Sequence, residues 1–206
     1  MFSPFPEEAN RKITTQVSSL NLAPTEVSRN NLLREGVNPD TVAVVGNTVI
    51  DALFHVLKKP VSFGEPELQR IYESEAPVLL LTCHRRENWG KPMDQVGRAV
   101  HQLAELLPNW QIVFPAHANP TVRATIGPHL KDDQNVFICD PLNYNEFSHM
   151  QQRARIILSD SGGVQEEAPA LGKPVLVLRE NTERPEAVQS GTVRLIGTNT
   201  KNIVRE

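Results

Sequence analysis

The sequence predicts an α/β fold in which a parallel β-sheet carries helices on both faces. Short apolar runs, many of them β-branched, alternate with stretches whose apolar residues recur at helical spacing, and this alternation is typical of parallel sheets. The run Val78–Thr82 (VLLLT) is apolar over nearly its whole length, as expected for a strand buried on both faces. Of the 206 residues, 39% are apolar and 22% are charged, which is enough for a substantial core.

The first 40 residues differ in character from the rest. After a turn or extended entry at residues 3–6, residues 10–36 predict a helix, a short strand at Leu20–Ala23 and a second helix. Asn38-Pro39-Asp40 is typical of a linker. We expect residues 1–40 to be the remnant of a preceding, mostly absent N-terminal domain, and residues 41–206 to form the sheet domain.

The sheet domain is expected to begin with a strand at Thr41–Val45, which Gly46 ends, and a helix at Thr48–Lys58. The strand Val78–Thr82 follows, and then an amphipathic helix at Pro92–Leu107 with proline in its first turn. The remaining strands, with helices between them, are expected at residues 111–114, 135–139, 155–159, 174–178 and 192–196, and a last helix begins near residue 201.

Composition excludes several classes of protein. A net charge of −3 and a pI of about 6.1 argue against a general nucleic-acid binder. No apolar run approaches the roughly 20 residues that cross a bilayer, and residues 1–8 do not form a signal peptide, so we expect a cytoplasmic protein. Cys83 and Cys139 lie in or beside apolar runs and are expected as buried thiols. The six histidines are scattered without metal-ligand spacing, and there is no Gly-x-Ser-x-Gly elbow.

The strongest local signal is the segment Ser159–Glu167 (SDSGGVQEE), which joins a buried strand to a helix. Ser161, Gly162 and Gly163 lie where the unpaired N–H groups of a helix start could hold a phosphate. The alternative is a plain strand-to-helix turn with Ser161 as N-cap. Glu167, further along the helix, could bind two ribose hydroxyls or could be an ordinary solvated glutamate.

Further candidates follow other strands of the predicted sheet, and parallel sheets bind ligands at the carboxyl ends of their strands. His84 and Arg85 suit an anionic ligand, although Arg85 or Arg86 could instead pair with Glu87 on the surface. His117 follows another strand and could equally be structural. The last candidates are Arg184, which could bind a ligand or merely start a helix, and the carboxylate pair Glu7 and Glu8, which could do acid–base work or remain exposed.

Taken in order, these segments resemble the non-hydrolysing UDP-N-acetylglucosamine 2-epimerases. The resemblance runs from end to end of the chain, and its ordered set of motifs is far more specific than any single one. The matching segments are 6–11 (PEEANR), 23–26 (APTE), 45–53 (VGNTVIDAL), 84–88 (HRREN), 115–120 (PAHANP), 159–172 and 184–186 (RPE). Family members run to nearly twice this length, so the resemblance implies that most of the N-terminal domain and the closing C-terminal helices are missing.

The resemblance implies a glycosyltransferase-B type fold of two Rossmann-like domains, with UDP held mainly by the C-terminal one. Glu7 and His84 would be catalytic, and Arg85 and His117 match positions that hold a second, activating UDP-N-acetylglucosamine in some members. The remaining matches are substrate-binding: Ser161, Gly162 and Gly163 for the diphosphate, Glu167 for the ribose, Leu142 and Phe147 for the uracil, and Arg11 and Arg184 for the substrate.

The implied reaction interconverts UDP-N-acetylglucosamine and UDP-N-acetylmannosamine, which feed cell-envelope polysaccharides. UDP leaves as the C2 proton is removed, giving a 2-acetamidoglucal, and then adds back with the proton on the other face. Neither cofactor nor metal is implied, and the full-length protein would be a homodimer; this truncated chain alone is expected to be inactive. Two alternatives remain: a UDP-sugar-binding module without turnover, and a glycosyltransferase of the same two-domain type.

Overall fold

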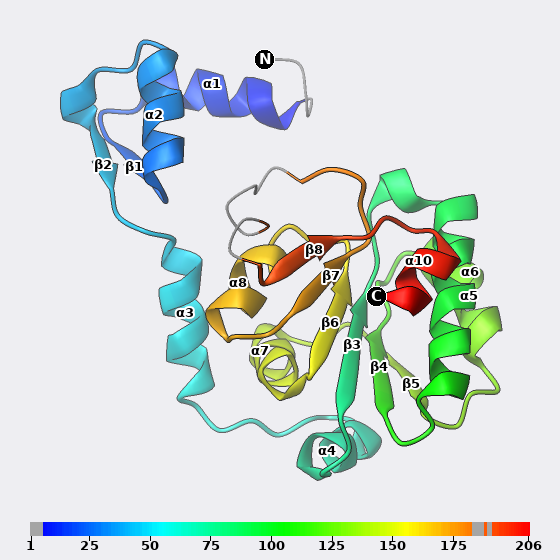
Figure 1. Cartoon of the computed structure of the whole chain (residues 1–206). Helices are drawn as coiled ribbons and strands as arrows, with labels where there is room; N and C mark the ends of the chain where they lie inside the picture. Colours follow the sequence, from blue (N-terminus) through cyan, green and yellow to red (C-terminus); the bar gives the residue numbers. More distant parts are fainter. Residues whose placement is uncertain (1–5, 183–187, 189–190) are drawn as a thin grey trace. The chain divides into compact units, whose positions relative to one another are not determined.

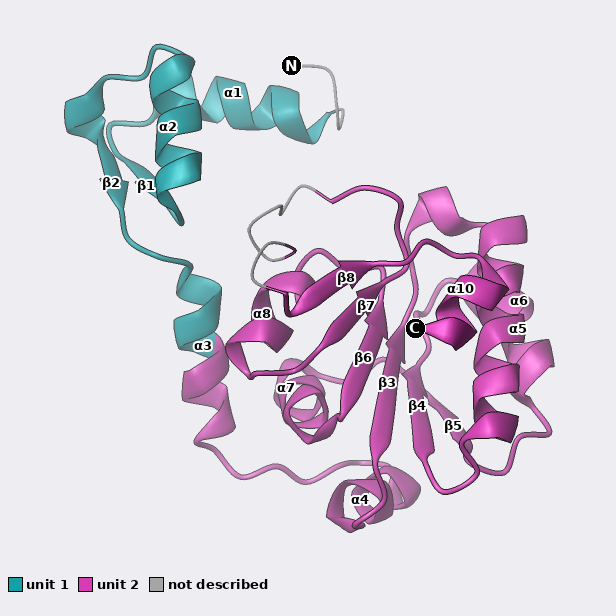
Figure 2. Cartoon of the chain, in the orientation of Figure 1, with its two compact units in different colours: residues 1–52 teal, residues 53–206 magenta. Residues whose placement is uncertain are grey.

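The computed structural model describes residues 6–182, 188 and 191–206 (Figure 1). The chain forms two compact units, unit 1 at Met1–Ala52 and unit 2 at Leu53–Glu206 (Figure 2). The helix α3 (Thr48–Leu57) crosses the boundary between them. Among the described residues, no helix is both long and apolar enough to cross a membrane.

Unit 1 contains the helix, strand and second helix that the sequence predicts. These are α1 (Glu7–Val17), β1 (Asn21–Ala23) and α2 (Glu26–Arg34). The α2 helix starts at Thr25, whose hydroxyl accepts a hydrogen bond from the Ser28 N–H and so satisfies one of the unpaired donors of the first turn. A 3₁₀ turn, η1 (Pro39–Thr41), leads into β2 (Val42–Val44).

The strand expected at Thr41–Val45 forms, but it does not join the main sheet. As β2 it pairs in parallel with β1, with Asn21 opposite Val42 and Ala23 opposite Val44. The expectation that this strand opens the larger sheet was therefore wrong. A β-branched run predicts a strand but does not predict which strand it pairs with. Here β1 and β2 are close in sequence, with α2 and a short 3₁₀ turn between them, so they pair in a local β-α-β unit.

Unit 2 is built on a six-stranded, fully parallel sheet with the order β5-β4-β3-β6-β7-β8. This confirms the predicted α/β architecture, and the observed strands lie within a residue or two of the expected ranges. The strands are β3 (Val78–Thr82), β4 (Gln111–Pro115), β5 (Val136–Cys139), β6 (Ile156–Ser159), β7 (Val175–Val177) and β8 (Val193–Leu195).

Helices cover both faces of this sheet (Figure 1). The α5 (Lys91–Leu106), α6 (Pro120–Leu130) and α10 (Thr200–Arg205) helices pack with Leu79 and Leu81 of β3 in one apolar cluster. Val78 and Leu80, which alternate with those residues along β3, face a second cluster. That cluster includes residues of α4 (Pro66–Glu73), α7 (Tyr144–Arg153) and α8 (Val164–Ala170). Cys83 and Cys139 are free, buried thiols, as expected.

The strand order creates a switch point between β3 and β6. From β3 the chain winds outward through β4 to β5, and it then returns to β6 on the other side of β3 and winds outward to β7 and β8. The loops that leave the carboxyl ends of β3 and β6 therefore diverge, and open α/β sheets bind ligands in the crevice at this position. The predicted phosphate site at Ser161–Gly163 follows β6, and the segment that begins with His84 follows β3.

Candidate functional site

Asp160 links the two loops at the switch point. It follows β6 directly, is fully buried, and accepts hydrogen bonds from the backbone N–H groups of His84 (3.0 Å) and Arg85 (2.9 Å). The side-chain amide of Asn88, in the 3₁₀ turn η2 (Arg86–Asn88), donates to the same carboxylate at 3.0 Å and to the Leu178 carbonyl at 3.2 Å. The ends of β3, β6 and β7 are thus held together by one buried carboxylate and its neutral donors.

The structure brings His84 and His117 together. Their rings are stacked with centroids 5.7 Å apart and an interplanar angle of 19°. His84 is partly exposed, and its Nδ1 lies 3.2 Å from Asp160 Oδ1. His117 is exposed, and its Nδ1 accepts a hydrogen bond from the Asn119 N–H. Arg85 Nη1 lies 3.9 Å from the Glu87 carboxylate, which is the surface ion pair considered as the alternative to ligand binding.

The loop after β6 is organised by its own hydroxyl groups. Thr82 and Ser159, opposite each other on β3 and β6, share a hydrogen bond of 2.6 Å between their hydroxyls. The Ser159 hydroxyl also accepts a hydrogen bond from the Ser161 N–H. Ser161 is not the N-cap of α8, since the helix starts at Gly163 without a side-chain cap. The plain-turn alternative therefore lacks the capping bond that would explain the serine.

Gly162 is buried and Gly163 is exposed in this loop. Within the described residues, no hydrogen bond uses the N–H of either glycine. Gly163 has an ordinary right-handed conformation, and an added Cβ would meet no other atom closer than the Ser161 hydroxyl at 3.9 Å. The fold therefore does not require glycine at 163, and the absence of a side chain instead leaves room for a ligand to approach the backbone.

Glu167 is buried rather than solvated. Its two carboxylate oxygens accept hydrogen bonds from the Tyr144 hydroxyl (3.1 Å) and the Gln151 side-chain amide (2.7 Å). Burial, followed by the charge of Glu167, raises the pKa of Tyr144, so the phenol stays a donor. Each Glu167 oxygen keeps acceptor capacity beyond these bonds. The side chain is thus fixed from α7 and can still accept from a ligand's hydroxyls.

Leu142 and Phe147 lie at the start of α7, partly buried and packed against the second apolar cluster. They offer apolar surface, and their assignment to a uracil pocket stays a prediction. Arg184 lies outside the described residues. No group of three or more potential metal-ligating side chains gathers in the part of the chain that the structure describes.

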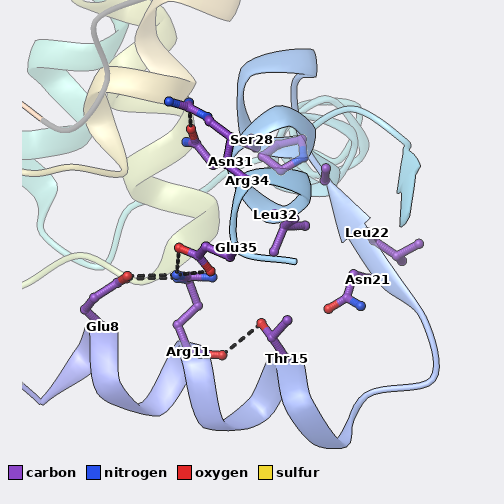
Figure 3. A pocket seen from close by; sticks show the side chains of 12 residues that line it. Glu8, Arg11, Thr15, Asn21, Leu22, Ser28, Asn31, Leu32, Arg34 and Glu35 are labelled. Atoms are coloured by element: carbon purple, nitrogen blue, oxygen red, sulfur yellow. Dashed lines mark hydrogen bonds and ion pairs between the residues drawn. The ribbon is translucent and has the colours of Figure 1, made fainter. Parts of the chain in front are cut away.

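Glu7 and Arg11 belong to unit 1, and Figure 3 shows the Arg11 side chain between those of Glu8 and Glu35. Glu7 is exposed in the first turn of α1. Arg11 bonds the carboxylates of both Glu8 and Glu35 at 2.7 Å, and these residues line a hollow of about 600 Å³ between α1, β1 and α2. The hydrogen bond with Arg11 lowers the pKa of Glu8 to about 2. Of this adjacent carboxylate pair, Glu8 is therefore the one held by Arg11, and the catalytic role of Glu7 stays a prediction.

Sequence reasoning did not assign Asp160, Tyr144 or Gln151. Asp160 stood inside the quoted motif, and its position directly after a buried strand was a signal that could have revealed it. Tyr144 and Gln151 carried no signal, because they contact Glu167 from positions 23 and 16 residues away in the sequence. Only the packing of α7 beside α8 places them there.

Comparison with known proteins covers the whole chain. It matches the UDP-N-acetylglucosamine 2-epimerase family over residues 1–206. The UDP-N-acetylglucosamine 2-epimerase of Neisseria meningitidis is 47% identical over 208 residues, covering 99% of this chain and 56% of the relative. A structure of the N. meningitidis UDP-GlcNAc 2-epimerase bound to UDP-GlcNAc has a TM-score of 0.87 at 46% identity, with 99% of this chain and 56% of that chain covered.

A more distant structure has the same fold. The UDP-GlcNAc 2-epimerase of Methanocaldococcus jannaschii, in complex with UDP-GlcNAc and UDP, has a TM-score of 0.79 at 36% identity, with 97% of this chain and 56% of that chain covered. The chain thus spans about half the length of the relatives that it matches. The predicted α/β domain of glycosyltransferase-B type is confirmed, and the chain belongs to the UDP-N-acetylglucosamine 2-epimerase family.

Proposed function

We propose that this chain is the UDP-binding part of an enzyme that interconverts UDP-N-acetylglucosamine and UDP-N-acetylmannosamine at C2. The observation that carries the proposal is the switch-point edge of unit 2, where Asp160, the residue directly before Ser161–Gly163, joins the loop after β6 to His84 in the loop after β3. The relatives that bind UDP-GlcNAc or UDP share this whole segment of chain. The full-length enzyme would act in the cytoplasm as a homodimer.

The proposed roles follow from the donors and acceptors at this edge. The N–H groups of Gly162 and Gly163, which have no hydrogen-bond partner among the described residues, would receive the diphosphate, and His84 would approach it from the β3 loop. Glu167 would accept from the ribose hydroxyls while Tyr144 and Gln151 hold its carboxylate. Leu142 and Phe147 would contact the uracil, Arg11 and Arg184 the substrate, and Arg85 and His117 a second, activating nucleotide sugar.

Epimerisation at C2 requires the departing UDP to be stabilised. The C2 proton of a sugar acetal is not acidic, so elimination of UDP and its re-addition is the more accessible route. Hydrogen-bond donors that already point at the diphosphate stabilise the charge that develops on the leaving group. An acid or base at C2 must come from elsewhere, and Glu7 is the candidate that this chain offers.

The binding test is calorimetry with UDP, UMP and pyrophosphate. A second phosphate that receives one or two hydrogen bonds from N–H groups should make UDP bind about 10- to 100-fold more tightly than UMP. Glu167→Ala should weaken UDP and spare pyrophosphate, because pyrophosphate has no ribose. The exposed Glu105→Ala serves as the matched control. Equal affinities for UDP and UMP would exclude the diphosphate assignment, and loss of both ligands in Glu167→Ala would indicate unfolding.

The turnover test compares this 206-residue chain with a full-length relative and monitors UDP-N-acetylmannosamine. We expect the chain to bind UDP without epimerising UDP-N-acetylglucosamine. One positioned acid or base typically contributes roughly 100- to 10,000-fold in rate, and Glu7 is exposed on α1 with no partner among the described residues that would position it. Robust turnover by this chain would show that the catalytic groups are misassigned, and it would also exclude the binding-module alternative.

A further inference from the structure

The two oxygens of the Asp160 carboxylate have different partners. Oδ2 receives three N–H donors: the backbone of His84, the backbone of Arg85 and the side chain of Asn88, all within 3.0 Å. Oδ1 lies 3.1 Å from the backbone nitrogen of His84, whose N–H it accepts, and 3.2 Å from the ring Nδ1 of the same residue, and the buried thiol of Cys83 also interacts with this carboxylate. Oδ2 therefore makes most of the bonds to the loop, and Oδ1 is the oxygen that faces the imidazole.

This division separates a structural role from a role in orienting His84. A single acceptor oxygen would be enough to satisfy the three converging donors, and an asparagine could provide it. The second oxygen adds an acceptor next to Nδ1, and an acceptor there favours a proton on Nδ1. The ring's other nitrogen, Nε2, is then left for a ligand.

We propose that Asp160 is a positioning residue that keeps His84 protonated on Nδ1 and thereby sets how the imidazole meets an anion at the switch point. A carboxylate that faces Nδ1–H stabilises an imidazolium, which donates from Nε2. The stacked His117 ring keeps this orientation by packing against the His84 ring. The consequence for UDP rests on the proposed function, whereas the protonation of the free protein does not.

The substitution Asp160→Asn tests this directly. The asparagine oxygen should stay with the three converging donors, which places its NH₂ group at the position of Oδ1. An NH₂ group facing Nδ1 can only donate, so Nδ1 must become the acceptor and the ring proton must move to Nε2. The three bonds to the remaining oxygen are kept and the contact of the His84 N–H with Oδ1 is lost, while the tautomer of His84 changes.

The first measurement is long-range ¹H–¹⁵N NMR of the ligand-free chain, with the His84 signals assigned from a His84→Ala spectrum. The expected result is an Nδ1-protonated His84 in the original chain and an Nε2-protonated His84 in Asp160→Asn. Asp140→Asn is the matched control, because Asp140 follows β5 at the same sheet edge and is largely exposed. An Nε2-protonated ring in the original chain, or no change in Asp160→Asn, would overturn the proposal.

The second measurement is UDP affinity in a double-mutant cycle with His84→Ala. Replacing a charged donor by a neutral one should weaken UDP about 5- to 10-fold in Asp160→Asn. In the His84→Ala background the same substitution should have less than about a twofold effect, because Asp160 acts through the imidazole. An equal loss in both backgrounds would show that Asp160 only supports the loop and would overturn the proposal.

The two measurements separate this inference from the proposed function. If the original chain binds no UDP, the proposed function fails, and the tautomer experiment alone decides the role of Asp160. If UDP binds and the tautomer does not change, the proposed function stands and the positioning role is excluded.

Discussion

Unit 1 and unit 2 are both built from parallel strands joined by helices, yet they bury their side chains to very different extents. Among the described residues of unit 1, only Ala23 and Val42 are buried, and neither α1 nor α2 contains a buried residue. Unit 2 has two apolar clusters, one on each face of its sheet. The same β-α-β connection therefore yields a core only when a sheet has enough strands for helices to cover both faces.

The two units also differ in how much apolar surface they expose. Unit 1 exposes most of the large apolar side chains that are exposed in the described chain, including Val17 at 81% and Ile13 at 62%. It is held instead by polar contacts, with Arg11 bonded to carboxylates on α1 and just after α2. Exposed apolar surface of this kind contributes nothing to the stability of the unit that carries it.

The largest effect that distinguishes the units should come from the core of unit 2. Phe114, fully buried in β4, packs in the cluster with α5 and α6. Its replacement by alanine should lower the free energy of unfolding by about 3–5 kcal/mol. In unit 1, Leu22→Ala should change it by less than about 0.5 kcal/mol, because Leu22 is 56% exposed.

Urea unfolding followed by tryptophan fluorescence measures this effect, because both tryptophans, Trp89 and Trp110, lie in unit 2. Far-UV circular dichroism reports on both units. A comparable loss of stability from the Leu22 and Phe114 substitutions would show that unit 1 has a core after all.

The same contrast explains how much of this molecule could be predicted from sequence. The strand at Val78–Thr82 and the α5 helix were predictable because burial imposes a pattern on their residues. The partner of β2 was not, since three β-branched or small residues fit either sheet. At the site, the Gly162–Gly163 turn was visible in sequence, whereas the bonds from Tyr144 and Gln151 to Glu167 depend on how two helices pack.

Hydrogen exchange should reveal a smaller but still clear difference between the units. Amides of α1 and α2 can exchange through local opening, because no buried side chain anchors these helices. Amides of β3 and β6 lie inside the sheet and need near-global unfolding. We expect protection factors in β3 and β6 that exceed those in α1 by at least about 100-fold, equivalent to roughly 3 kcal/mol. Equal protection in both units would mean that they unfold as one.

The smallest effect should come from lowering the pH, which should reduce the stability of unit 1. The hydrogen bond from Arg11 lowers the pKa of folded Glu8 to about 2, below the value of about 4.3 for an unfolded glutamate. This pairing stabilises unit 1 above that unfolded value, and its contribution is lost as the pH falls from about 4 toward 2. Glu8→Gln should therefore flatten the acid dependence of the helical circular dichroism signal without moving the tryptophan signal.

Unit 2 supplies the matched control for this last prediction. Glu67 and Arg70 form the same i,i+3 pair on α4, and the hydrogen bond from Arg70 likewise lowers the pKa of Glu67. Among the described residues, Arg70 pairs with this one carboxylate. The α4 helix is anchored by the buried Leu68 and Ile71, whereas α1 has no buried residue. Glu67→Gln should therefore leave the acid dependence of both signals unchanged. If Glu67→Gln reduced the acid dependence of the helical circular dichroism signal as much as Glu8→Gln does, ion pairs would contribute equally to the stability of the two units. Unit 1 would then not differ from unit 2 in relying on polar contacts instead of a buried core.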